Sequence, residues 1–473
     1  MREERGVKSE GEKLVAHYEM RGYIPSCSPK SEAVSVGLKR PLSVLVLAAV
    51  LSMAASVAEA ALPIQHWTTS SGAGVYFVES RSIPMLDINV DFDAGGRRVP
   101  ADRAGLGGLT HTLVKAGSAG HSEEEISRRI ADVGAQLGGS VDRDRSGLSL
   151  RTLSSERERT QAIATFAEIL QTPAFPEAAF AREKARLVDS VKEEETKPDA
   201  IASKAFYRLL YAAHPYALAP TTEAVLRIER ADVENFYRAN YVARRAVVTI
   251  VGDADRALAE RIAEQLTAGL SRAAGAPAPL PAVVQPRGET IHVAHPATQS
   301  HILLGLPAMT RNDLDYFPLL VGNYTLGGGG FVSRLMREVR EKRGYAYSVY
   351  SYFLPLAQEG PFQIGLQTKK EQAEAALAQV RVVLSDFLAH GPSAAELRAA
   401  KQNLVGGFAL RIDSNRKLLE QVALIGFYQL PLTWLDDFTA RVEKVSVDQV
   451  RAAFARRVRP DNLVTVVVGS GEK

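Results

Sequence analysis

The chain has 473 residues, of which 46% are hydrophobic and 23% charged, and its formal net charge is +3. This length exceeds what one ordinary core holds and predicts at least two sizeable domains. The small net charge points to neither nucleic acid nor an acidic membrane surface as a partner, so we expect neither.

The first sixty residues have the features of a leader. Lys39 and Arg40 precede an apolar run, Leu42 to Ala55, which ends near Ala58-Glu59-Ala60. A basic start, a short apolar stretch and an A-x-A end are typical of a secretory signal peptide and predict cleavage after Ala60. A membrane anchor is the alternative, but the run is short for a span and no charged stop-transfer cluster follows it. We therefore expect residues 1–60 to be removed and the protein to be periplasmic or secreted.

The leader also contains the only cysteine, Cys27. After cleavage the chain would hold neither disulfides nor a reactive thiolate. No second apolar span follows the leader, so we expect no stable membrane span in the mature protein.

Strand and helix patterns alternate through residues 61–270, which we predict to be the first domain. Period-two alternation and β-branched residues predict strands at Val75–Val78 and Leu86–Phe92, and a short apolar run predicts a buried strand at Ala246–Val251. Amphipathic periodicity predicts four helices between them: Gly105–Lys115, Glu123–Val133, Glu156–Leu170 and Glu177–Glu194.

Residues 271–287 interrupt this alternation. Their sequence, SRAAGAPAPLPAVVQPR, is dominated by proline and alanine and keeps neither a helical nor a strand period. Such a composition predicts a semi-rigid linker between two domains.

Residues 288–473, the second predicted domain, repeat the pattern of the first. The predicted strands are Ile302–Leu306, Tyr345–Phe353, Phe362–Gln367 and Leu463–Val468, and the predicted helices are Tyr316–Leu326, Ser333–Arg340, Glu371–Ala389 and Ala394–Ile412. In both halves a proline corner leads into a long helix and a hydrophobic strand closes the unit. A duplicated α+β unit therefore accounts best for the order of elements.

Two stretches resemble landmarks of the pitrilysin/insulinase (inverzincin) family of zinc peptidases, which includes the mitochondrial processing peptidases. The first is AGLGGLTHTLVKAG, at 104–117, and the second runs from Asn323 through the glycine run and VREKRGYAYSV, which ends at Val349. The likeness extends over nearly all of residues 62–470 in the same order. It implies two tandem homologous α/β-sandwich domains that form one half of a clamshell, as in the processing peptidases.

The zinc motif of that family, H-x-x-E-H, is missing. Its two histidines lie four residues apart, so both leave one face of a helix and can share a zinc ion, and the glutamate between them activates the bound water. With the flanking glycines aligned, Gly108 stands in place of the first histidine, His111 in place of the glutamate and Thr112 in place of the second histidine. The resemblance places the third ligand near Asp189. One imidazole cannot hold a catalytic zinc, so we expect no metal and no cofactor in this chain.

Other histidines offer no clear replacement. Neither H-x-x-E-H nor H-E-x-x-H occurs anywhere in the sequence. His292, His295 and His301 lie close together, but an offset of three places His292 and His295 on opposite faces of a strand. We therefore expect them to have structural or hydrogen-bonding roles, and we expect His111 to be a helix residue that faces the former zinc position.

The second half keeps the family's other catalytic groups. In the family an arginine and a tyrosine of the second domain contact the substrate backbone and stabilise the transition state, and Arg340 and Tyr347 match these positions. A guanidinium offers fixed N–H donors and a phenol can donate to an oxyanion, so both suit this task. A surface ion pair for Arg340 and a core ring for Tyr347 are the alternative.

The glycine run matches the glycine-rich loop of the family's second domain, where a bare backbone lets a peptide approach closely. It comprises Gly327, Gly328, Gly329 and Gly330. It is not a phosphate loop, because no Lys-Ser/Thr follows at the required spacing. The resemblance assigns these glycines to substrate binding.

In bacterial members of the family, the zinc motif and the arginine and tyrosine can lie on two different chains. The resemblance therefore implies a noncatalytic subunit of a periplasmic heterodimeric zinc peptidase. Its partners would be a homologous subunit that carries zinc and a peptide substrate. A peptide-binding or scaffold protein without an enzyme partner, and a zinc peptidase with unorthodox ligands, are the alternatives.

Overall fold

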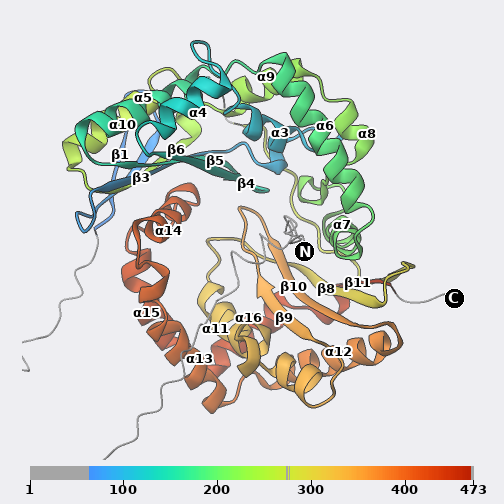
Figure 1. Ribbon diagram of the computed structural model, residues 1–473. Helices are drawn as coiled ribbons and strands as arrows, with labels where there is room; N and C mark the ends of the chain where they lie inside the picture. The colour runs from blue at the N-terminus through green and yellow to red at the C-terminus, as the bar shows by residue number, and fades with distance from the viewer. Residues whose placement is uncertain (1–62, 273–274, 276, 470–473) are drawn as a thin grey trace, which may run out of the picture. The chain divides into compact units, whose positions relative to one another are not determined.

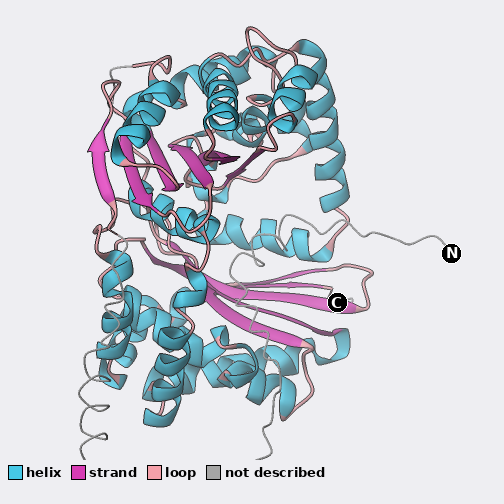
Figure 2. Ribbon diagram, turned by 60° about the vertical axis from the view of Figure 1, so that its left-hand side comes forward, coloured by secondary structure: helices cyan, strands magenta, loops and turns pink. Residues whose placement is uncertain are grey.

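The computed structural model describes residues 63–272, 275 and 277–469 (Figure 1). The predicted signal peptide, its cleavage point and Cys27 lie outside the described residues. Two β-sheets with helices on their faces make up the described chain (Figure 2). None of the helices described in this part of the chain is both long and apolar enough to cross a membrane.

The first sheet has six strands in the order β1-β2-β6-β3-β5-β4. Strand β6 is parallel to β2 and antiparallel to β3, and the remaining pairs are antiparallel. The strands are β1 (Gln65–Thr68), β2 (Gly74–Glu79), β3 (Met85–Phe92), β4 (Gln136–Val141), β5 (Ser146–Leu153) and β6 (Ala246–Gly252).

The second sheet has five strands in the order β7-β11-β8-β10-β9. Here β11 is parallel to β7 and antiparallel to β8, as β6 is to β2 and β3. The strands are β7 (Thr290–Val293), β8 (Gln299–Met309), β9 (Ser348–Phe353), β10 (Gly360–Lys369) and β11 (Val464–Val468). Apart from β1, each strand of the first sheet has a counterpart in the second, which confirms the predicted α+β duplication.

Fourteen α-helices are described. Their ends often carry the expected signals: α6 begins after Pro176, and Ser393 and Glu396 form a reciprocal capping box at the start of α13. The helices of the first half are α3 (Leu106–Leu113), α4 (Glu123–Ala131), α5 (Glu156–Gln171), α6 (Glu177–Glu194), α7 (Pro198–Tyr211), α8 (Thr222–Leu226), α9 (Arg230–Asn240) and α10 (Arg256–Thr267). Those of the second half are α11 (Tyr316–Asn323), α12 (Ala373–His390), α13 (Ala394–Gly406), α14 (Asn415–Phe427), α15 (Trp434–Lys444) and α16 (Val447–Arg457).

Helix α7 belongs to the first half but packs on the second sheet. Its Phe206, Leu210 and neighbours form one apolar cluster with Val464 and Val466 of β11. The opposite face of the same sheet carries alternate residues, such as Ile302 and Leu304, and packs against α12 (Figure 1). The second sheet is therefore covered on one face by a helix from the other half.

Helix α14 makes the reciprocal exchange. It comes from the second half and contacts β6, β3 and β2 of the first sheet. Gly426 allows the close approach, because a Cβ there would come within 2.7 Å of both Tyr76 and Val247. The other face of the sheet, with Val75 and Phe77, is covered by helices of its own half. Neither predicted domain thus completes both faces of its sheet alone, and the boundaries at 270 and 288 stay a prediction.

A buried carboxylate also joins the two halves. Asp144, in the β4–β5 turn, is 0% exposed and accepts four hydrogen bonds. Arg97 and Tyr216 of the first half donate from 3.0 and 2.5 Å, and the Ala357 amide and the Tyr428 hydroxyl of the second half both donate from 2.8 Å. Four donors satisfy a charge that would otherwise be costly to bury.

The predicted linker forms neither a helix nor a strand in its described residues. Hydrogen bonds nevertheless hold it to the rest of the chain, among them the three that follow. The carbonyls of Ala278 and Pro281 accept hydrogen bonds from Arg98 and Gln358, and the Gln285 amide donates to the Pro307 carbonyl.

Two predicted helices near the second motif have a different form. We predicted helix over Tyr316–Leu326 and Ser333–Arg340, but α11 ends at Asn323 and continues as a π-helix, Tyr324–Gly328, and a second π-helix spans Met336–Glu341. Glycine at 327 and 328 weakens the ordinary helical pattern here. Such wide helical turns occur often at functional sites.

Candidate functional site

Helix α3 carries the positions of the lost zinc motif. It begins after Gly105, whose φ of +104° is readily adopted only by glycine. Gly108 is half-buried, and a Cβ added there would meet no atom within 4 Å. Thr112 is exposed one turn later, and its hydroxyl donates to the Gly108 carbonyl over 3.2 Å. This face of α3 is open but presents no metal ligand of the kind zinc prefers.

His111 is a buried residue of α3. Its exposed fraction is 7%, and its Nδ1 lies 3.0 Å from Ser146 Oγ, which lies 2.8 Å from the Tyr241 hydroxyl. The ring also fills the space beside Gly139 of β4. Burial, helped by the positive charge of Lys115, lowers the pKa of His111 to about 3, so the imidazole is neutral near pH 7.

Asp189 does not complete a ligand set. It lies on the exposed side of α6. Within residues 63–272, 275 and 277–469, no group of three or more His, Cys, Asp or Glu side chains could hold a metal ion. With a glycine, a buried histidine and a hydroxyl already bonded to the backbone, the residues at the motif positions do not fit a catalytic zinc.

The three clustered histidines of the second half, His292, His295 and His301, make local contacts. His292 Nδ1 lies 3.8 Å from a Glu374 carboxylate oxygen. His295 lies beyond the end of β7, and its Nε2 is 3.1 Å from the Thr196 carbonyl. His301 Nδ1 is 3.4 Å from the Gln367 amide nitrogen. Each contact fits the structural or hydrogen-bonding role that we expected.

The glycine run lies where α11 passes into the first π-helix. A Cβ on Gly327 would come 2.6 Å from the Ser351 backbone nitrogen, and one on Gly329 would come 2.6 Å from the Tyr324 carbonyl oxygen. Gly330, by contrast, is exposed, has φ +59° and has open space around it. Close packing therefore requires glycine at the buried end of the run, and only its exposed end offers a bare backbone to a peptide.

Arg340 and Tyr347 lie together at the surface of the second half. Tyr347 is 81% exposed and makes no hydrogen bond within the described residues. The Arg340 guanidinium carbon lies 5.4 Å from the centre of the Tyr347 ring and 4.8 Å from that of Phe331, which is 67% exposed. The Arg340 cation thus lies within cation–π distance of two aromatic rings. Tyr347 is thus no core ring, which removes that alternative.

The cations around Arg340 have carboxylate partners, but Arg340 has none among the described residues. Arg334 binds Glu396 and Asp386, and three further neighbours contact Glu338 at 2.9 to 3.8 Å: Arg337, Lys342 and Arg343. In the part of the chain that the structure describes, no carboxylate lies within ion-pair distance of Arg340. Its charge and the Tyr347 hydroxyl are therefore available to a molecule outside this chain.

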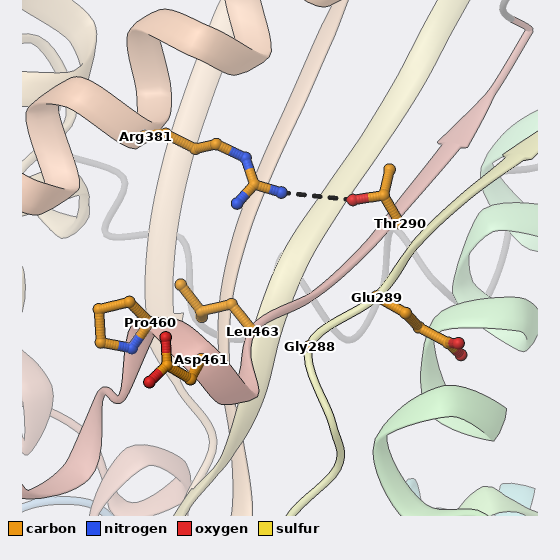
Figure 3. Close-up of a pocket in the computed structure, with 7 residues that line it drawn as sticks. All are labelled: Gly288, Glu289, Thr290, Arg381, Pro460, Asp461 and Leu463. Atoms are coloured by element: carbon orange, nitrogen blue, oxygen red, sulfur yellow. Dashed lines mark hydrogen bonds between the residues drawn. The ribbon is translucent and has the colours of Figure 1, made fainter.

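Two shallow pockets lie on the second half. One of about 240 Å³ is lined by Tyr347 and by polar residues at the ends of β8 and β10. The other, of about 340 Å³, lies where β7 begins and is lined by Arg381, Glu289 and Asp461 among others (Figure 3). In it the Arg381 guanidinium is held by the hydroxyls of Thr290 and Thr465. Only the first pocket includes a residue of either motif.

Comparisons with known proteins place this geometry in a family. Residues 75–221 match the model of the insulinase family, peptidase family M16, and residues 227–404 match the model described as the peptidase M16 inactive domain. A crystal structure of a peptidase M16 inactive domain from Pseudomonas fluorescens is 35% identical, with a TM-score of 0.83, over 87% of this chain and 98% of that one. The chain belongs to the insulinase family, M16.

Other M16 relatives agree with this assignment. An uncharacterized zinc protease of Streptomyces coelicolor is 26% identical over 73% of this chain and 76% of its own length. A protein of Helicobacter pylori described as a non-peptidase homolog is 24% identical over 84% of this chain and 92% of its own length. With Gly108, His111 and Thr112 at the motif positions, this chain is an M16 homologue of the inactive type, and the predicted two-domain fold is confirmed.

Sequence reasoning missed several residues of these M16 sites. Phe331 directly follows the glycine run, and an aromatic residue beside an exposed glycine loop was a usable signal. Nothing in the sequence connects Ser146 and Tyr241 with His111. Ser146 lies 35 residues after His111, and Tyr241 lies 95 residues after Ser146. Lys369, at the edge of the pocket beside Tyr347, carried no signal in the sequence.

Proposed function

We propose that this chain is the zinc-free subunit of a heterodimeric M16 peptidase. In this proposal a homologous partner supplies zinc and the activated water. This chain supplies Arg340 and Tyr347, which bind the peptide and stabilise the developing oxyanion. The observation that carries the proposal is that Tyr347 is exposed and Arg340 has no carboxylate partner in the described chain, whereas His111 and Thr112 of the lost zinc motif are hydrogen-bonded within the chain.

The chemical step would be divided between the subunits. Zinc in the partner acts as Lewis acid and lowers the pKa of its bound water. Tyr347 can donate its O–H, and Arg340 its fixed N–H fork, to the peptide carbonyl as negative charge develops there. The Phe331 and Tyr347 rings, both within cation–π distance of Arg340, help to hold the guanidinium in place before the peptide arrives.

Peptide binding has a second support in the sheet edges. Strand β4 is the last strand of the first sheet and lies beside α3, and β9 is the last strand of the second sheet and directly follows Tyr347. An edge strand presents unpaired backbone groups to which an extended peptide can add. The same observation favours the second candidate, a peptide-binding protein that works without an enzyme partner.

Co-expression with a relative from the same genome that carries H-x-x-E-H, ideally one encoded by the neighbouring gene, tests the proposal. We expect a complex of one copy of each chain and a peptidase activity that needs both chains and is abolished by a chelator. Elemental analysis should find zinc in the complex and well under one zinc per molecule in this chain alone. Full activity of the partner by itself would contradict the proposal, and failure to form a complex would favour the scaffold candidate.

The periplasm is the proposed location. The signal-peptide pattern at Lys39–Ala60 supports it. Mature protein should begin near Ala61 and fractionate with the periplasm. An N-terminal sequence that starts at Met1, or recovery from the cytoplasm, would overturn this part of the proposal.

A further inference from the structure

The pocket beside Tyr347 has a defined polar lining. It is formed by the start of β8, the turn before β9, the end of β10 and the short helix after it, and its volume is about 240 Å³. Binding sites for whole small molecules usually measure roughly 300–1,000 Å³. This pocket therefore suits a single side chain of a larger ligand. Its lining residues are Gln299, Gly344, Tyr345, Ala346, Tyr347, Gln367, Thr368, Lys369 and Gln372.

Lys369 gives the pocket a positive charge that no carboxylate in the described residues neutralises. Its ammonium group has neither a hydrogen bond nor an ion pair in the described residues, whereas the adjacent Lys370 donates to the His295 carbonyl over 2.9 Å. None of the nine lining residues is acidic, and the acidic residue nearest in sequence, Glu371, does not line the pocket. The other polar side chains of the lining are amides and hydroxyls. The Thr368 hydroxyl already donates to the Tyr345 carbonyl, whereas amide N–H groups can donate to an anion without competing for Lys369.

Arg340 is a second cation near the same tyrosine. It contacts the Tyr347 ring, and unlike its four basic neighbours it has no carboxylate partner in the described chain. Tyr347 thus lines one pocket with the unpaired Lys369 and contacts the unpaired Arg340. Two uncompensated positive groups beside one tyrosine favour a negatively charged ligand over a neutral or basic one.

We propose that this pocket is a subsite for an acidic side chain, aspartate or glutamate, of the bound peptide. The carboxylate contacts Lys369 and the surrounding amide donors, while the peptide backbone passes Tyr347 and Arg340. This inference rests on the proposed function, since it names the substrate class of the same surface. It makes the protein selective for peptides that carry an acidic residue near the point of contact.

Two fluorescein-labelled ten-residue peptides test the subsite on the full chain. One alternates alanine with glutamate, and the other replaces every glutamate with glutamine. Fluorescence anisotropy should show about tenfold tighter binding of the glutamate peptide, because one charge-assisted hydrogen bond contributes on the order of this factor. The preference should weaken with added salt.

Lys369→Gln should reduce the preference to about threefold or less, where Arg340 alone still favours the charged peptide. Lys342→Gln is the matched control, because it also removes one exposed ammonium but from a lysine that is paired with Glu338 at 2.9 Å. The control should keep the full preference. Equal loss in both variants, or full preference in Lys369→Gln, would overturn the subsite.

The outcomes separate this inference from the proposed function. Equal binding of both peptides by the wild type overturns the acidic subsite but leaves peptide binding intact. Absence of binding to either peptide also overturns the subsite. The cleavage assay with the zinc-bearing partner then decides the proposed function independently.

Discussion

The two motif regions of this chain have opposite relations to their surroundings. On α3 His111, which stands at the glutamate position of the motif, is buried and hydrogen-bonded to Ser146, and the Thr112 hydroxyl donates to its own helix. In the second half, Arg340 and Tyr347 lie at the surface without polar partners among the described residues. Where ligands were lost, the polar groups that remain are satisfied within the fold. In the second half, by contrast, the unpaired Tyr347 hydroxyl lies where an outside molecule can reach it.

Substitution of Arg340 or Tyr347 should have the largest effect on the peptidase rate. We expect Arg340→Ala and Tyr347→Phe to lower the peptidase rate of the mixed complex by roughly a hundred- to a thousandfold, as loss of one oxyanion donor does. Arg340→Lys should fail as well, because one ammonium cannot reproduce the planar fork. The free energy of unfolding should change by less than about 0.5 kcal/mol, as for an ordinary surface substitution.

Rate assays on reconstituted pairs and urea unfolding of the isolated variants measure both effects. Assembly and the partner's zinc content are the controls and should not change. Full activity of Arg340→Ala and Tyr347→Phe in a complex of normal size would mean that these residues are structural, and the chain would then be better described as a scaffold.

The stability that the buried His111 contributes should depend on pH. The unfolded imidazole takes up a proton near pH 6.5, whereas in the folded chain the pKa of His111 is about 3. Acidification below pH 6.5 therefore stabilises the unfolded state by up to about 1.4 kcal/mol per pH unit. His111 should contribute its full stability above pH 6.5 and lose it as the pH falls towards 3.

Urea unfolding at pH 7 and pH 4.5 measures this contribution. His111→Gln should lose about 2 kcal/mol less stability between these two pH values than the wild type does. His390→Gln, at an exposed histidine of α12, is the matched control and should follow the wild type. Parallel behaviour of His111→Gln and the wild type would show that the imidazole is not held neutral.

Substitution of Phe331 should lower the peptidase rate less than substitution of Arg340 or Tyr347. Its ring lies 4.8 Å from the Arg340 guanidinium, and an exposed cation–π contact contributes about 0.5–1 kcal/mol. We therefore expect Phe331→Leu to lower the rate of the mixed complex at saturating peptide by about two- to fivefold. Val332→Ala, at the neighbouring exposed residue, should leave it unchanged. Equal rates for wild type and Phe331→Leu would show that Phe331 does not position Arg340.

The smallest effect is expected at the open face of α3. Thr112→His alone should add no zinc, since Gly108 supplies no second ligand. Gly108→His with Thr112→His should gain some zinc, because both imidazoles leave one helix face and a side chain at 108 meets no atom within 4 Å of its Cβ. Elemental analysis distinguishes the two variants. Zinc bound tightly by the single variant would reveal a ligand that we have not identified.

Local pattern sufficed for much of the fold. The alternation in Leu86–Phe92 matches β3 to within one residue, and the predicted helix Glu177–Glu194 is α6. No strand was predicted over Gln136–Leu153, because Gly138 and Gly139 interrupt the pattern of β4. The helix exchange was also out of reach, since periodicity identifies an apolar face but not the sheet that covers it.

The candidate site was predictable only in part. The motif identified Arg340 and Tyr347 as candidates. Neither spacing nor composition shows that Arg340 has no carboxylate partner among the described residues while its basic neighbours have one. The spacing of α3 likewise placed His111 on a helix. Its burial depends on Gly139 and Ser146 of the β4–β5 hairpin, which come close only through the tertiary fold.

The exchange of α7 and α14 has a consequence for the order of folding during synthesis. The first sheet is complete in sequence at Gly252, but the helix that covers Tyr76 and Val78 begins at Asn415. At roughly 5–20 residues per second, a ribosome delivers that helix on the order of ten seconds later. Until then an apolar sheet face stays open to water, so a chain released before Asn415 would aggregate. The two halves, although duplicated, become native together and only once nearly the whole chain is made.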